Sequence, residues 1–274
     1  LFGYALPVEY GGLGFSTSDD VRLAFELGWT APAFRSMFGT NNGIAGQVLV
    51  NFGTPRQRAA FLPRLAAGEV SCFCLTESEA GSDPSGMRTR AIRDGDHYVI
   101  NGAKRFITNA ALSDLFITFA KTDPSAEGSR GISVFVVESD TPGLVVGEHD
   151  KKMGQSGAWT SDVYYEDVRV PAQALIGEVE GKGFGAAMRS LAKGRLHIAA
   201  VCVGLASRIL GESVRYAAEA RQGGAPIARF QLVPAMLAEM HTDVFAGRAM
   251  VLEAARLFDA GEDTRMAPAA TKLF

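Results

Sequence analysis

The spacing of apolar residues divides the 274-residue chain into three zones. From Thr17 to about Ala67 the apolar positions recur with the period of amphipathic helices. Within this zone "TPRQRAAFL" predicts a helix start, with Thr54 as the N-cap, Pro55 at the first helical position and Gln57 completing a capping box. We therefore expect residues 1–70 to form a helical N-terminal domain, truncated at its start.

The second zone, from Ser71 to Val170, changes to the period-two pattern of β-strands. Its short segments are rich in β-branched and aromatic residues and are separated by turn sequences such as "RDGD" and "DTPG". Asp94-Gly95 is a hairpin turn signal. Several strands without intervening helices predict an antiparallel β-barrel over residues 71–180.

The helical period returns after Gly183. One apolar stripe runs from Met188 to Ile209 and a second from Val233 to Phe258, joined by the polar "EARQGGAPIARFQ". This pattern predicts two long helices, the first half of a helical bundle over residues 181–274. The glycine-rich "EGKGFGAA" that opens this zone lacks the Ser or Thr of a phosphate loop and is interpreted as a linker. The whole chain is expected to be an α+β multidomain protein.

Composition narrows the classes of function. A net charge of −3 without a Lys/Arg stripe argues against nucleic acid as a partner, and no uninterrupted apolar run approaches the length of a membrane span, so no membrane insertion is expected. The three cysteines form no disulfide framework and suggest a reducing compartment, and the four histidines lack metal-ligand spacing. No metal site is predicted. Because the chain begins at Leu1 and stops within an apolar helical pattern, we expect a piece of a longer protein.

Two strand ends carry the chemical signal. "SCFCLTESEAGSD", from Ser71 to Asp83, begins as a strand and continues into hydroxyls, carboxylates and a glycine. "NGAKRFITNA", from Asn101 to Ala110, again places an aromatic residue beside a hydroxyl. Each stretch alone is typical of a strand edge with ordinary turn chemistry. Their combination, in this order with "KMG", "YYEDVRVP" and "GRLHIAA", indicates a function.

With these segments the sequence resembles the acyl-CoA dehydrogenase family over essentially its whole length. The specific motifs are "C-x-T-E-x-x-A-G-S-D" at Cys74 to Asp83 and "K-x-F-I-T-N-A" at Lys104 to Ala110. The resemblance implies FAD as the cofactor, and a flavin ring does need donors at its polar edge and an aromatic wall on its face. The implied cofactor-binding residues are Phe73, Cys74, Leu75, Thr76, Gly81, Ser82, Phe106, Ile107, Thr108, Arg221, Phe230 and Gln231.

The resemblance also assigns places within this set. Phe73 to Thr76 would line the flavin edge, and Phe106 to Thr108 would cover the ring face, with the threonine near N5. Most familiar members carry Trp where this chain has Phe106, so the stacking wall is kept without the indole donor. Ser82 would approach both the flavin diphosphate and the acyl-CoA.

Other matches are imperfect. Arg195 would help to hold the CoA part of the substrate, although an arginine snorkelling to the end of the bundle is the alternative interpretation, and Ala192 replaces the aspartate that many members carry three residues earlier. Many family members carry an arginine in the loop joining the two long helices, and it reaches the FAD diphosphate of a neighbouring subunit. Arg221 lies one residue after the position that aligns with that arginine. Phe230 and Gln231 match a pair near the adenine end of FAD.

The implied reaction is α,β-dehydrogenation of an acyl-CoA thioester, in which a carboxylate removes the α-proton and a hydride passes to flavin N5. One family position for this base is Gly194 here, which has no side chain. Glu77 and Glu79 are interpreted as solvated loop acids. No catalytic residue is therefore assigned in this chain, and the base is expected beyond Phe274.

The resemblance further implies an electron-transferring flavoprotein as the electron acceptor, a homotetramer, and a role in fatty acid or amino acid catabolism in the cytoplasm or the mitochondrial matrix. Two alternatives stay open at this point. One is a fold relative with different oxidative chemistry, such as an acyl-CoA oxidase, a nitroalkane oxidase-like enzyme or a flavin monooxygenase. The other is a non-catalytic flavoprotein subunit.

Overall fold

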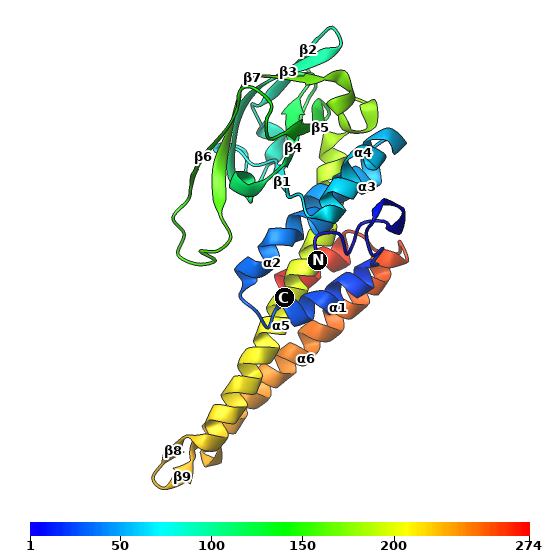
Figure 1. The fold of residues 1–274 in the computed structure, drawn as a ribbon. Helices are drawn as coiled ribbons and strands as arrows, with labels where there is room; N and C mark the ends of the chain where they lie inside the picture. The colour runs from blue at the N-terminus through cyan, green and yellow to red at the C-terminus, as the bar shows by residue number, and fades with distance from the viewer. The chain divides into compact units, whose positions relative to one another are not determined.

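The computed structural model describes residues 1–274 and confirms the helix start that the sequence predicts at Thr54 (Figure 1). Ser16 and Thr54 each accept a hydrogen bond from the third residue of the helix that follows, in reciprocal capping boxes with Asp19 and Gln57. The helices before the sheet are α1 (Thr17–Leu27), α2 (Pro32–Gly39), the π-helical turn η2 (Thr40–Ile44), α3 (Ala45–Phe52) and α4 (Pro55–Ala67).

Seven strands form one sheet with the order β1-β4-β2-β3-β7-β6, and β5 pairs with β4. The strands are β1 (Ser71–Cys74), β2 (Arg90–Asp94), β3 (His97–Thr108), β4 (Leu115–Lys121), β5 (Ile132–Glu138), β6 (Leu144–His149) and β7 (Thr160–Pro171). Short 3₁₀ turns complete the chain at η1 (Val8–Tyr10), η3 (Pro84–Gly86), η4 (Ala110–Leu112), η5 (Ala172–Ala174), η6 (Ile176–Glu178) and η7 (Ile227–Arg229).

The expectation of an antiparallel barrel needs correction, because the sheet is mixed. β1 runs parallel to β4, and β2 meets β4 in a short parallel pairing at Arg90 and Lys121. The chain leaves β1, makes the β2–β3 hairpin and returns to start β4 beside β1, a crossover that gives two strands the same direction. No pairing joins β1 to β6, so the pairings alone do not close a barrel.

The predicted hairpin turn is present between β2 and β3. Asp94 pairs with His97, so the two residues of the turn are Gly95 and Asp96, one position after the Asp-Gly pair itself. Gly95 has φ of 62°, a left-handed conformation in which glycine carries no steric penalty.

The centre of the sheet is buried on both faces. Along β4, Leu115, Ile117 and Phe119 belong to one hydrophobic core, and Phe116 and Ala120 belong to another. The first core also contains Val48, Leu49, Leu62 and Leu65, so α3 and α4 cover this face of the sheet (Figure 1). The strand end at β1 is thereby held between a helical layer and the rest of the sheet.

The backbone packs into two compact units, each described here by itself. Unit 1 consists of Leu1–Phe15 and Ala33–Leu191, and unit 2 consists of Ser16–Pro32 and Ala192–Phe274. The division follows packing rather than sequence order, since α1 belongs to the second unit. The domain boundaries expected near residues 70 and 180 stay a prediction.

Unit 2 contains the two long helices that the sequence predicts, α5 (Gly183–Glu219), which begins in unit 1, and α6 (Leu232–Asp259). They lie side by side, and the small hairpin of β8 (Arg221–Gln222) and β9 (Ala225–Pro226) joins them at their tip (Figure 1). Helices α1 and α7 (Met266–Leu273) pack against α6.

Helix α5 is also long and apolar enough to cross a membrane, judged only by its length and composition, although the sequence contains no uninterrupted apolar run of that length. A single helix of this kind is weak evidence, because core helices of globular proteins have the same composition. Its residues Leu196, Ala200 and Val201 lie in the hydrophobic core of unit 2 with Val21 and Phe25 of α1.

Candidate functional site

The two sequence motifs meet in unit 1 where β1 ends. The Arg105 N–H of β3 donates to the Thr76 carbonyl just beyond β1, at 2.8 Å. The ammonium of the neighbouring Lys104 donates to the Leu75 carbonyl at 3.3 Å. Residues that lie about thirty positions apart in the sequence are therefore joined at one strand end, as a common binding site requires.

A buried ion pair fastens this junction. Lys104 Nζ lies 2.8 Å from Glu77 Oε1, and the Lys104 side chain is fully buried. The Glu77 carboxylate also accepts hydrogen bonds from the backbone N–H groups of Arg88, at 2.6 Å, and Thr89, at 3.1 Å. The interpretation of Glu77 as a solvated loop acid is wrong, because the loop folds the carboxylate inward onto Lys104. Glu79 is exposed, as expected.

The electrostatics of the pair follow from burial and attraction. Burial alone would raise the pKa of Glu77, but the Lys104 ammonium and the backbone donors outweigh it, so the pKa lies below its usual value. Burial has the larger effect on Lys104 and lowers its pKa, with Glu77 opposing the change. The two opposite charges attract each other across 2.8 Å and hold the two motifs together from the inside.

The predicted cofactor-binding residues of unit 1 fall into two groups. Cys74, Leu75 and Ile107 bury their side chains in the hydrophobic cores, so only their backbone groups are available to a ligand. The residues that are partly or fully accessible are Phe73, Thr76, Gly81, Ser82, Phe106 and Thr108.

The accessible group has the donor chemistry that a flavin requires. The Thr76 N–H, the Thr76 hydroxyl and the Thr108 hydroxyl find no acceptor within the protein. The Phe106 side chain beside them is 57% exposed, in a left-handed backbone conformation with φ of 58°. Hydrogen-bond donors next to an open aromatic face suit a planar ligand with a polar edge, so these residues fit FAD.

The remaining predicted residues belong to unit 2. Arg195 lies half-buried on α5 without an ion pair. Arg221 is exposed in β8 and donates to the Gly224 carbonyl at 3.3 Å. Phe230 and Gln231 are exposed immediately before α6. The structure leaves these four side chains available for ligands, and their roles stay predictions.

Sequence reasoning missed several residues that build the site. Arg105 forms an ion pair with Asp162 of β7 at 2.8 Å. Asn109, with φ of 66°, donates through its side chain to the Ser36 carbonyl at 2.8 Å and to the Thr40 hydroxyl at 3.0 Å, which ties the second motif to α2 and η2. One sequence signal was available for the contact between the two motifs: Glu77 in the first motif and Lys104 in the second carry opposite charges.

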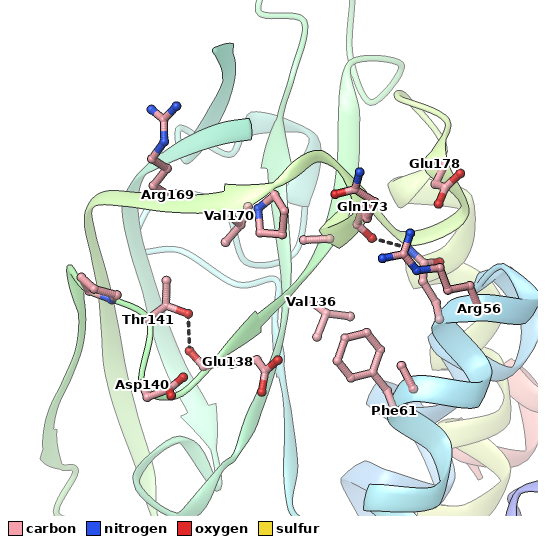
Figure 2. A pocket seen from close by; sticks show the side chains of 15 residues that line it. Arg56, Phe61, Val136, Glu138, Asp140, Thr141, Arg169, Val170, Gln173 and Glu178 are labelled. Carbon is pink, nitrogen blue, oxygen red and sulfur yellow. Dashed lines mark hydrogen bonds between the residues drawn. The ribbon is translucent and has the colours of Figure 1, made fainter. Parts of the chain in front are cut away.

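A cavity lined by α4, β5 and β7 lies elsewhere in unit 1. Its volume is about 640 Å³, and none of its lining residues belongs to either motif. Figure 2 shows Phe61 of α4 facing Val136 of β5, with Arg56, Gln173 and Glu178 to one side and Glu138, Asp140 and Arg169 to the other. Glu138 is paired with Arg64 at 2.9 Å and Arg169 with Asp94 at 2.5 Å. The lining carries charges of both signs and favours no particular ligand.

Comparison with known proteins agrees with this geometry. Residues 1–69, 72–168 and 181–274 match the N-terminal, middle and C-terminal domains of acyl-CoA dehydrogenase. The chain is 40% identical to cyclohex-1-ene-1-carbonyl-CoA dehydrogenase of Syntrophus aciditrophicus, over 93% of this chain and 61% of that protein. It is also 40% identical to subunit CarC of the caffeyl-CoA reductase-Etf complex of Acetobacterium woodii, over 94% of this chain and 68% of that one.

A solved structure gives the same result. Glutaryl-CoA dehydrogenase of Mycobacterium smegmatis in complex with FADH2 superposes with a TM-score of 0.92 at 32% identity, covering 99% of this chain and 68% of that one. The chain thus spans 61% to 68% of the length of these three proteins.

Proposed function

The chain belongs to the acyl-CoA dehydrogenase family, and on that premise we propose that it functions in the FAD-dependent α,β-dehydrogenation of an acyl-CoA thioester. The observation that carries the proposal is the junction of the two motifs. There the Lys104–Glu77 pair joins β3 to the end of β1, beside the free donors of Thr76 and Thr108 and the open Phe106 ring.

FAD, when bound, supplies a hydride acceptor for the β-carbon of the substrate. Thr76 and Thr108 would hold its ring through hydrogen bonds, and Phe106 would cover one face and exclude water. Phe73, Cys74, Leu75 and Ile107 would shape the edge and floor through backbone groups and packing. The protein contributes alignment and a desolvated environment, and the redox chemistry is that of the cofactor.

Ser82 and Arg195 are proposed to bind the acyl-CoA. Arg195 suits an anionic CoA group because its guanidinium has no carboxylate partner within the protein. Removal of the α-proton requires a carboxylate, and Gly194, the residue immediately before Arg195, has no side chain to provide one. We therefore assign no catalytic base within these 274 residues.

The finer features of the family complete the proposal. Gly81 and Ser82 would approach the FAD diphosphate, with Arg221 reaching that of a neighbouring copy and Phe230 and Gln231 near the adenine. The domains would be residues 1–70, 71–180 and 181–274, assembled as a homotetramer in the cytoplasm or the mitochondrial matrix. The relative named as a subunit of an Etf complex supports an electron-transferring flavoprotein as the acceptor.

The test is the identity and stoichiometry of the cofactor. The purified protein, saturated with FAD and passed over a desalting column, should release one FAD per chain on acid treatment, resolved from FMN by chromatography. Thr76→Ala should lower the retained amount. A protein that retains neither FAD nor FMN after saturation, while still folded by circular dichroism, would overturn the proposal.

A second candidate is the reverse reaction, reduction of an α,β-unsaturated acyl-CoA, which the reductase name of the Acetobacterium woodii relative favours. The site residues are the same in both directions. The midpoint potential of the bound FAD, compared with that of the enoyl-CoA/acyl-CoA couple, separates the two directions. A flavin potential more negative than that of the couple favours reduction of the enoyl-CoA.

A further inference from the structure

The pairing of β3 with β7 is interrupted beside the flavin motif. Lys104 pairs with Val163, and the next pairing joins Ile107 to Ser161. Arg105 and Phe106 therefore oppose a single residue, Asp162, and form a β-bulge. Such bulges re-aim side chains and occur next to functional sites.

The bulge brings the side chains of two consecutive residues, Arg105 and Phe106, into contact with each other. Lys104 and Ile107 are buried, whereas Arg105 is half-buried and Phe106 is exposed. In a regular strand, neighbours point to opposite faces. The left-handed conformation of Phe106 produces the change, and a bulky aromatic residue rarely adopts it unless its surroundings hold it there.

Arg105 makes contacts that hold Phe106 in its left-handed conformation. Its guanidinium carbon lies 4.7 Å from the centre of the Phe106 ring, and its Nη1 lies 2.8 Å from Asp162 Oδ2. The Tyr164 hydroxyl reaches the same carboxylate oxygen at 3.4 Å. The backbone N–H of Arg105 also binds the Thr76 carbonyl, so one residue contacts both flavin motifs.

We propose that Arg105 and Asp162 are positioning residues for flavin binding, which fix the Phe106 ring by packing the guanidinium on one face and leaving the other face for the isoalloxazine. The inference rests on the proposed function, because it takes FAD as the ligand. It extends that function by assigning roles to Arg105, the unspecified position of the second motif, and to Asp162, which lies outside both motifs. Without the Arg105–Asp162 ion pair, the Phe106 ring would lose its fixed orientation, and the bulge would no longer hold Phe106 exposed.

The experiment is a set of FAD affinities, measured by the quenching of flavin fluorescence on binding to the apoprotein. Arg105→Gln and Asp162→Asn should each weaken FAD binding by about threefold to tenfold, the value of one oriented contact. The visible spectrum of the bound FAD should lose vibronic resolution in both. Arg105→Lys, which keeps the ion pair without the planar stack, should fall between Arg105→Gln and the unchanged protein. Arg169→Gln, which breaks an exposed Arg–Asp pair on the same sheet, is the matched control and should change neither readout.

A double-mutant cycle separates positioning from general stability. In a Phe106→Leu background, Arg105→Gln should produce no further loss of affinity, because there is no ring left to orient. Full additivity of the two substitutions would overturn the inference, as would FAD affinities and spectra equal to those of Arg169→Gln. If the unchanged protein bound no FAD at all, the proposed function itself would fail instead.

Discussion

The Lys104 ammonium and the Glu77 carboxylate show how a single residue pair determines the site. Both groups lie out of water, where an ion pair adds little net stability but is costly to break, since the partner left behind keeps its charge without compensation. The pair joins the strand that presents Thr76 to the strand that presents Phe106. Loss of either charge therefore affects the fold and the site together.

Replacing Lys104 with Met should lower the free energy of unfolding by about 3–5 kcal/mol, because Glu77 is left as an unpaired buried charge. Adding Glu77→Gln to Lys104→Met should recover part of this loss, since the double variant buries no charge. Urea unfolding followed by circular dichroism measures both. Equal stabilities of the single and double variants would contradict the account.

The same pair predicts an acid sensitivity. The pKa of Glu77 in the folded protein lies below its model-peptide value of 4.5, so the unfolded chain binds the proton more readily. The stabilisation is therefore complete above a pH of about 4.5 and is lost as the pH falls through the lowered pKa. Glu77→Gln should flatten the decrease of stability between about pH 5 and pH 3, whereas the exposed neighbour substituted as Glu79→Gln should keep the original slope.

At the scale of elements, glycines determine how closely helices approach. A Cβ built on Gly204 of α5 would lie 2.0 Å from the Phe25 carbonyl oxygen of α1, and one built on Gly28 would lie 2.4 Å from the Val201 carbonyl oxygen. These neighbours are backbone atoms, which cannot yield without moving a helix. The close contact of α1 with α5 therefore depends on both glycines.

Gly204→Ala should destabilise the protein by about 1–3 kcal/mol through this overpacking. Gly211→Ala on the same helix is the matched control, because its added Cβ meets no atom within 4 Å. There the substitution should stabilise by about 0.5–1 kcal/mol through the better helix propensity of alanine. Thermal unfolding of the two variants tests the contrast, and a stabilised Gly204→Ala would contradict it.

Local sequence signals predicted where helices and turns form better than they predicted which strands pair with each other. The capping box at Thr54 and the turn near Gly95 depend on neighbouring residues, so the sequence was sufficient to place them. The parallel pairing of β1 with β4 and the bulge opposite Asp162 depend on register between distant strands, which no local pattern encodes. For the same reason the motif residues were identifiable while the inward position of Glu77 was not.

On the scale of the whole molecule, α1 illustrates a further limit. Its amphipathic pattern predicts a helix, but the pattern does not say which core receives its apolar face. The structure packs Val21 and Phe25 with α5 and α6 in unit 2, although α2, α3 and α4 follow α1 directly in the chain and belong to unit 1. Domain membership is a property of packing, and sequence order is only a guide to it.

The outer half of the α5–α6 pair leaves a set of large apolar side chains exposed, namely Val214, Tyr216, Phe230, Leu232, Met236 and Phe245. Where exposed apolar side chains form one contiguous patch, the patch is typical of a protein–protein contact surface. Arg221 lies at the tip of the same pair, in β8. If this surface joins copies of the chain, the arginine can serve the cofactor of a neighbouring copy.

We therefore expect the FAD-loaded protein to be a homo-oligomer whose cofactor retention depends on assembly. Leu232→Glu should give monomers that lose FAD on dilution, because a charge would be buried in the contact. Arg221→Gln should keep the oligomer and still lose FAD faster, whereas Arg130→Gln, an exposed arginine between β4 and β5, should change neither property. Light scattering after gel filtration, with the flavin-to-protein absorbance ratio of each peak, measures both quantities. Monomers that keep stoichiometric FAD at high dilution would contradict the shared site, because their cofactor would need no contribution from a second copy.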